Sequence, residues 1–244
     1  MGIHSVTDNG KEPSGWTVLH FADVGTSEEW VQQLAIEMPE LVDASLIRDP
    51  EPQKVKESIL TILFEGLIPA FEDLKLIRVS GGAEIPILNR RKHYEDFARV
   101  LWHAYKDLMP KTALLMGFDI GFIFQNDKNF EKGLLVFQSD HPHVSVQFGS
   151  HLRDQRTRWQ NALGKFRNHY LEHREDSPDK YEVFYRPDIA EAHFDAVWRS
   201  SADVLFLCLA SRLIPGIGIE EIPVAERNPE RPRRFRYVGW PSAV

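Results

Sequence analysis

The sequence predicts a mainly α-helical protein: a helical bundle with a few short peripheral β-strands and an irregular C-terminal tail. Apolar residues recur at the i, i+3, i+4 spacing of amphipathic helices over several long segments. Glycine and proline separate these segments, and apolar runs typical of strands are short. The chain has 244 residues, 43% of them hydrophobic and 27% charged, so it can bury a core without disulfides or a structural metal.

The composition divides the chain into three parts. Residues 1–15 are polar and contain scattered glycine and proline, which predicts a loosely ordered N-terminus. Residues 16–213 hold the periodic apolar segments and are predicted to form a single helical-bundle domain. Residues 214–244 are rich in glycine and proline and are predicted to be a C-terminal extension, in which residues 234–238 form an edge strand or part of a hairpin.

In the first half of the chain, the pattern predicts one short strand followed by helices. Residues 16–24 are expected to be the strand, and a polar cap precedes a helix over 28–36. A long apolar helix is expected over 55–76, where Pro69 predicts a kink or a break. A loop follows over 81–86.

The middle of the chain is expected to hold a helix that starts at Asn89, ends near Pro110 and restarts over 113–124. Its buried face is predicted to consist of Phe97, Val100, Leu101, Ala104, Tyr105 and Leu108.

The second half of the chain is expected to contain both short strands and long helices. Residues 134–137 and 144–148 have a strand-like apolar pattern. An amphipathic helix is predicted after Ser150, and a final helix over 189–213.

Composition also disfavours several classes of protein. The net charge of −7 argues against a broad nucleic-acid-binding surface. No apolar stretch reaches the roughly 18 residues of a membrane helix, and the N-terminus lacks the basic-then-apolar layout of a signal peptide. A single cysteine, Cys208, excludes an intramolecular disulfide. These observations predict a cytoplasmic protein with no membrane partner.

Residues 151–174 are basic within this acidic chain and have a net charge of +4. Such a stretch forms either a solvated helix face or a surface that binds phosphate groups. On the second interpretation, the substrate-binding residues are Arg153, Arg156, Arg158, Lys165 and Arg174.

The same stretch contains Arg167 and Asn168, followed after four residues by His173. A neutral histidine near its ordinary pKa of about 6.5 can take a proton from a ribose hydroxyl or return one to a leaving oxygen. An arginine can hold a phosphate and stabilise the charge that builds on it. This chemistry needs no metal or other cofactor. Arg186 and His193 have a similar spacing, but without the asparagine or the basic surroundings.

The Arg167-Asn168-x4-His173 pattern on an amphipathic helix resembles the motif of HEPN ribonucleases, a superfamily of helical-bundle proteins. The resemblance implies a metal-independent endoribonuclease with Arg167, Asn168 and His173 as catalytic residues, acting as a toxin or phage-defence effector. It also implies RNA as substrate, a homodimer in which two such pairs meet, and a protein partner such as an antitoxin or a defence-complex subunit. Because Arg167 and His173 lie about 120° apart on a continuous helix, a shared site needs a helix break or a second subunit.

Two other interpretations stay open. A non-catalytic binding or scaffold protein with the same bundle would use His173 at the edge of the core. His169, Glu172 and His173 also form an H-x-x-E-H pattern, in which two histidines on one helix face ligate zinc and the glutamate acts as general base in a hydrolase. His141 and His143 flank a loop proline and are expected to be incidental.

Overall fold

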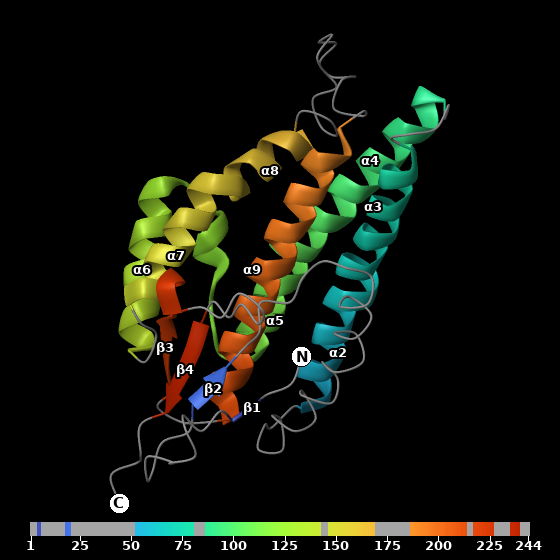
Figure 1. The fold of residues 1–244 in the computed structure, drawn as a ribbon. Coiled ribbons are helices and arrows are strands. Elements are labelled where there is room, and N and C mark those ends of the chain that lie inside the picture. The colour runs from blue at the N-terminus through green and yellow to red at the C-terminus, as the bar shows by residue number, and fades with distance from the viewer. Residues whose placement is uncertain are drawn as a thin grey trace, which may run out of the picture.

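The computed structural model describes residues 4–5, 18–20, 52–80, 86–142, 146–168, 186–213, 217–226 and 235–239 (Figure 1). Helices predominate among these residues, which confirms the predicted mainly α-helical class. The helical elements are α2 (Pro52–Thr61), η2 (Ile62–Leu67), α3 (Ile68–Ser80), α4 (Ile87–His103), η3 (Ala104–Leu108), α5 (Met109–Leu115), η4 (Gly121–Phe124), α6 (Asp127–Asp140), α7 (Val146–Gln155), η5 (Arg156–Gln160), α8 (Asn161–Arg167), α9 (Pro187–Leu213) and η9 (Val224–Glu226).

Helix α9, with 27 residues, runs through the middle of the molecule between two groups of helices (Figure 1). Helices α2, α3 and α4 lie on one side of it in this view, and α6 and α7 lie on the other. Helix α3 packs along α4 and against α9, while α8 crosses over to contact α4. The predicted helix over 189–213 is therefore the central element of the bundle.

In the part of the chain that the structure describes, three long helical rods change from α to π geometry partway along, at η2, η3 and η5. These segments join α2 to α3, α4 to α5, and α7 to α8. A π-helical turn holds more residues than an α-turn, so it rotates the face that the following helix presents. The segments η2 and η3 pack against each other, where Gly66 meets Ala104.

Two prolines follow π segments directly and do not end their helices. Pro69 lies in the first turn of α3 after η2, and Pro110 lies in the first turn of α5 after η3. A proline inside an α-helix removes a hydrogen bond and clashes with the carbonyl four residues earlier, and the change of helix type relieves both problems. The predicted end near Pro110 is wrong, because the helix continues to Leu115. It ends before Gly117, whose φ of +89° is a left-handed conformation that favours glycine.

The strands predicted over 134–137 and 144–148 are also wrong where the structure describes them. Residues 134–137 lie inside α6, and residues 146–148 lie inside α7. Helix α6 is capped by Asn126, whose side chain accepts a hydrogen bond from the backbone N–H of Asn129 at 3.0 Å. Its buried residues are Phe130, Leu134 and Phe137, which have helical rather than strand spacing.

The described residues include four strands: β1 (His4–Ser5), β2 (Val18–His20), β3 (Ile217–Glu221) and β4 (Phe235–Gly239). They pair antiparallel in the order β1-β2-β4-β3. Strand β4 therefore lies between β2 and β3 and not at an edge of the sheet. It pairs antiparallel with β3, the preceding strand, which is the hairpin arrangement that was the other expectation for residues 234–238. Strand β3 contacts α7 and α9, which places this sheet beside the helices. The sheet joins the N-terminal and C-terminal parts of the chain, since β2 pairs with β4.

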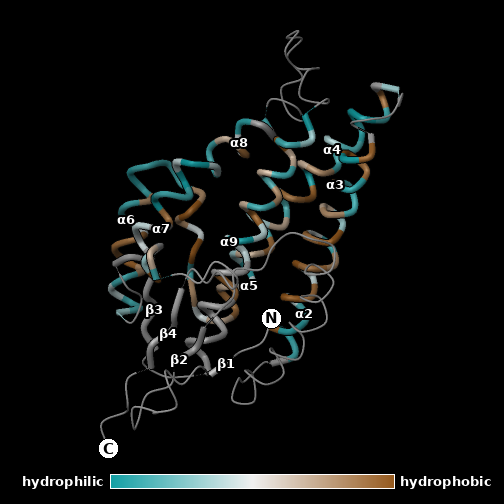
Figure 2. The backbone as a smooth tube through the Cα atoms, in the orientation of Figure 1, coloured by the Kyte–Doolittle hydropathy of each residue, from teal (hydrophilic) through white to brown (hydrophobic). Residues whose placement is uncertain are grey.

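The hydrophobic core lies between the rods and α9. Its largest fully buried side chains include Trp198 and Phe194 from α9, Phe97 from α4 and Tyr105 from η3. In Figure 2 the apolar stretches alternate with polar ones along each helix, as expected for helices that bury one face. No helix in the described part of the chain is long and apolar enough to cross a membrane.

Candidate functional site

The predicted catalytic motif begins at the end of helix α8. Arg167 is the last residue of α8, and Asn168 follows it with an exposed side chain. The side chain of Arg167 and all of His173 lie outside the described residues, as do His169, Glu172 and Arg174. The ribonuclease pair and the zinc pattern therefore both remain predictions.

Helix α8 turns one face to the bundle and the other to solvent. Leu163 is fully buried, and Gly164 is close enough to α4 that an added Cβ would lie 3.3 Å from the Trp102 ring. Lys165 and Asn168 are exposed. Lys165 makes no ion pair with another described residue. The beginning of the motif thus lies on an accessible helix end next to a cation that is open to solvent.

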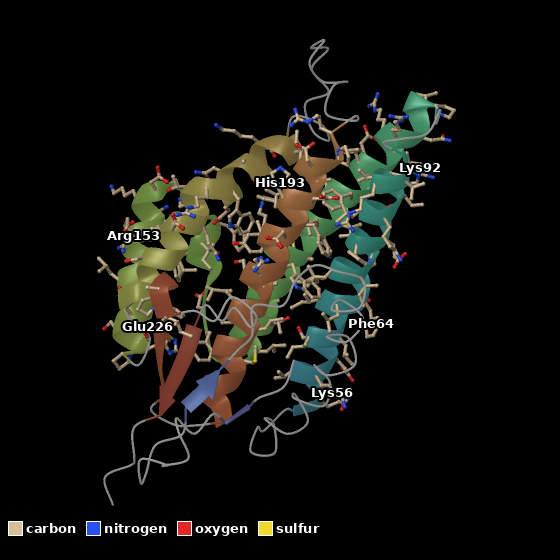
Figure 3. All side chains as sticks on the ribbon, viewed as in Figure 1. Lys56, Phe64, Lys92, Arg153, His193 and Glu226 are labelled. Carbon is tan, nitrogen blue, oxygen red and sulfur yellow. The ribbon has the colours of Figure 1, made fainter. Side chains whose placement is uncertain are left out.

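Arg153, on α7, is held by a carboxylate of the neighbouring helix α6. Its Nε and Nη2 atoms donate to the two carboxylate oxygens of Glu131 at 2.7–3.1 Å. Hydrogen bonding by Arg153 lowers the pKa of Glu131, so the pair is charged throughout the neutral range. Both side chains are more than 40% exposed, and Arg153 projects outward in Figure 3. A phosphate could reach this arginine, but it would have to compete with Glu131.

Arg156 is more deeply buried than Arg153 and Arg158, with only 12% of its side chain exposed. It pairs with Asp127 at 2.9 Å and donates to the carbonyl oxygen of Ile123 at 3.0 Å. Its guanidinium also lies over the ring of Phe130, 5.0 Å from the centroid. These contacts join η5 to the beginning of α6, so the role of Arg156 is structural.

The remaining described arginine of this surface, Arg158, pairs with Asp154 on the same helical rod at 2.6 Å. Its side chain is 76% exposed. Such an i, i+4 pair at the surface contributes little to stability and opens readily. Of the five predicted substrate-binding residues, Arg158 and Lys165 are therefore the described ones most accessible to an anion.

The second arginine–histidine match does not form an accessible site. Arg186 pairs with Asp188 at 2.7 Å just before α9. His193 is buried on α9 between the helix groups (Figure 3), and burial lowers its pKa to about 4. It is neutral at pH 7 and belongs to the packing of the helices.

A cleft that sequence analysis missed lies between residues 117–125 and α6, with a volume of about 570 Å³. Its lining residues are Gly117, Asp119, Phe122, Gln125, Asn129, Lys132, Gly133, Val136, Phe137, Asp140 and His141. We call it the α6 cleft. The signal in the sequence was the run from Gly117 to Gly121 together with His141, but α6 had to be recognised as a helix before these residues could be placed together.

Comparison with known proteins identifies no relative. No protein-family model matches the chain, and neither a curated protein nor a solved structure shows significant similarity to it. Among the described residues, no group of three or more His, Cys, Asp or Glu side chains could hold a metal ion. The HEPN resemblance therefore stays a prediction from the sequence motif.

Proposed function

We propose that this chain is a HEPN-like, metal-independent endoribonuclease in which Arg167, Asn168 and His173 act on an RNA phosphodiester. The observation that carries the proposal is the position of the motif, which begins on the exposed end of α8 in a mainly helical protein. On this proposal the protein works in the cytoplasm as a toxin or phage-defence effector, as a homodimer, under the control of a protein partner such as an antitoxin or a defence-complex subunit.

In the proposed reaction, the neutral imidazole of His173 removes the proton from a ribose 2′-hydroxyl. The 2′-oxygen attacks the phosphorus, the bond to the 5′-oxygen breaks, and the leaving oxygen takes a proton from a protonated histidine of the second subunit. Arg167 holds the phosphate and stabilises the negative charge that builds on it. Asn168 supplies a neutral hydrogen-bond donor beside the arginine.

The electrostatics of the described residues favour RNA contact near the end of α8. Arg153 and Arg156 are engaged by Glu131 and Asp127, whereas Lys165 is exposed. Lys165, together with Arg158 and Arg174, would meet the phosphates on either side of the cleaved bond.

The test compares Arg167→Ala and His173→Ala with the parent chain for cleavage of a single-stranded oligoribonucleotide in excess EDTA. Loss of a proton-transfer group lowers the rate by on the order of 10² to 10⁴, and we expect losses of this size with unchanged melting temperatures. Arg99→Ala and His103→Ala are matched controls, because both residues are exposed on α4 and pair with carboxylates of the same helical rod. The controls should cleave at the parental rate.

Two results would contradict the ribonuclease proposal. One zinc ion per chain, lost on mutating His169 or His173, would support the zinc-hydrolase alternative with Glu172 as general base. Failure of the parent chain to cleave any RNA, with a lowered melting temperature for His173→Ala, would support a structural role for this histidine.

The non-catalytic alternative, a binding or scaffold protein, is favoured by one specific observation. Arg153, Arg156 and Arg158 each have a carboxylate partner within the chain, so much of the predicted phosphate-binding surface is already neutralised. A scaffold with this surface would bind RNA weakly, with little dependence on salt concentration, because few counterions would be released. Nuclease activity that depends on Arg167 would reject this alternative.

A further inference from the structure

The α6 cleft has an aromatic floor. The ring centroids of Phe122 and Phe137 are 5.7 Å apart, and those of Phe137 and His141 are 4.7 Å apart. The imidazole of His141 stacks on Phe118 at 4.6 Å, which holds the ring in place. A floor of this kind suits a flat ligand, because rings gain stability from offset or edge-to-face contacts.

The floor depends on a glycine in α6. An added Cβ at Gly133 would collide with the Cβ and Cγ atoms of Phe122. Because α6 has no side chain at this position, the phenyl ring can lie against the helix backbone, and both residues line the cleft.

The charged groups at the cleft are mostly acidic. Asp119 and Asp140 both line it, and neither forms an ion pair with a described cation. One oxygen of Asp119 accepts a hydrogen bond from the backbone N–H of Gly121 at 3.0 Å, which orients its carboxylate. Lys132 is the cation among the lining residues at neutral pH, since burial lowers the pKa of His141 and keeps its ring neutral. The cleft therefore carries a net negative charge.

We propose that the α6 cleft binds a small planar organic cation, such as an aromatic amine or amidine. The ring of the ligand would pack on Phe122 and Phe137, and its cationic end would meet the carboxylates of Asp119 and Asp140. The side-chain amides of Gln125 and Asn129 line the same cleft and offer further hydrogen bonds to ring substituents. A volume of about 570 Å³ lies within the roughly 300–1,000 Å³ of small-molecule sites.

Charge selects the ligand class. A nucleotide or other anion would be repelled by two carboxylates against one ammonium, and a purely apolar ligand would gain nothing from the two exposed carboxylates. This inference does not depend on the ribonuclease proposal, because none of the lining residues belongs to the Arg167 and His173 motif.

The test uses isothermal titration calorimetry of the full chain with benzamidine, a planar cation, and with benzoate, a planar anion of similar size. We expect saturable binding of benzamidine and none of benzoate. The double variant Asp119→Asn/Asp140→Asn should weaken benzamidine binding about tenfold or more, because each exposed ion pair contributes a few-fold. Lys132→Met should leave the affinity unchanged or raise it, since it removes a like charge.

Glu131→Gln is the matched control, because it removes one negative charge from the side of α6 that faces α7. It should bind benzamidine as the parent chain does. The proposal is overturned if benzamidine does not saturate, if benzoate binds equally well, or if the Asp119→Asn/Asp140→Asn variant retains the parental affinity. The mutated aspartates are exposed, so melting temperatures close to the parental value are expected and verify the fold.

Discussion

Because η2 packs closely on η3 at Gly66, we expect Gly66→Ala to lower the stability of the chain. A Cβ at this position would lie 2.5 Å from the Cβ of Ala104 and 3.3 Å from its Cα. Neither of these atoms can move by rotating a side chain, because both are fixed to the backbone of η3. Gly66→Ala should therefore push the two helical rods apart at the point where they touch.

Two effects of opposite sign determine the size of the change. Alanine is favoured over glycine inside a helix by up to about 1 kcal/mol. Overpacking a close contact costs about 1–3 kcal/mol, since neighbouring core side chains lose contact when the backbones separate. The net loss in the free energy of unfolding is then about 0–3 kcal/mol, with a central value of about 1–2 kcal/mol. For a chain of this size, this corresponds to a melting temperature lowered by roughly 2–8 °C.

Thermal unfolding followed by far-UV circular dichroism measures this shift. Gly164→Ala on α8 is the matched control, because its Cβ would meet only the ring of Trp102 at 3.3 Å, and a ring can tilt. We expect that control to be as stable as the parent chain or more stable by up to about 1 kcal/mol, because only the helix preference for alanine then remains. The double variant Gly66→Ala/Ala104→Gly removes the colliding methyl group. Its loss in the free energy of unfolding should be smaller than the sum of the losses of the two single variants. A melting temperature for Gly66→Ala at or above the parental value, or strict additivity in the double variant, would refute this account of how η2 packs on η3.

Two further predictions concern buried and surface charges. Arg156→Met should lower the free energy of unfolding by about 1–3 kcal/mol, because it removes a hydrogen bond to Ile123 and the contact with Phe130. The exposed Arg158→Met should change it by less than about 0.5 kcal/mol; equal effects in urea titrations would contradict the structural role of Arg156. His193 stays neutral in the folded chain down to pH about 4, whereas its unfolded pKa is about 6.5. Between these values only the unfolded chain takes up the proton, so stability that is present above pH 6.5 should fall by roughly 3 kcal/mol on acidification to pH 4. His193→Gln should lack this component, and parallel pH–stability curves for parent and variant would rule it out.

Helices with a long, regular apolar pattern could be predicted from the sequence alone. The expected helix over 189–213 corresponds to α9 at Pro187–Leu213, and the one over 55–76 falls within the continuous rod from α2 to α3. In both, the buried residues follow the 3.6-residue period for several turns. A pattern of that length fits a helix and does not fit the two-residue period of a strand.

Short patterns were ambiguous. The apolar run over 134–137 is short enough to fit a buried strand as well as a helix. The N-cap that identifies a helix is Asn126, eight residues before this run. The effect of Pro69 and Pro110 was also not predictable from their neighbours. Both prolines continue a helix because a π segment precedes them, and this segment is stabilised by packing between rods that are distant in sequence.

The candidate site, too, could be predicted only in part from the sequence. The mainly helical class, the basic character of residues 151–174 and the Arg167, Asn168 and His173 motif could all be read from the amino-acid order, because they depend on residue type and local spacing. Which of the charges are compensated became clear only once the helices were placed in space. The partners of Arg153 and Arg156 lie on α6, 22 and 29 residues away in the sequence, and the α6 cleft likewise forms between two segments. Ion pairs and cavities depend on distances between separate elements, and packing sets those distances.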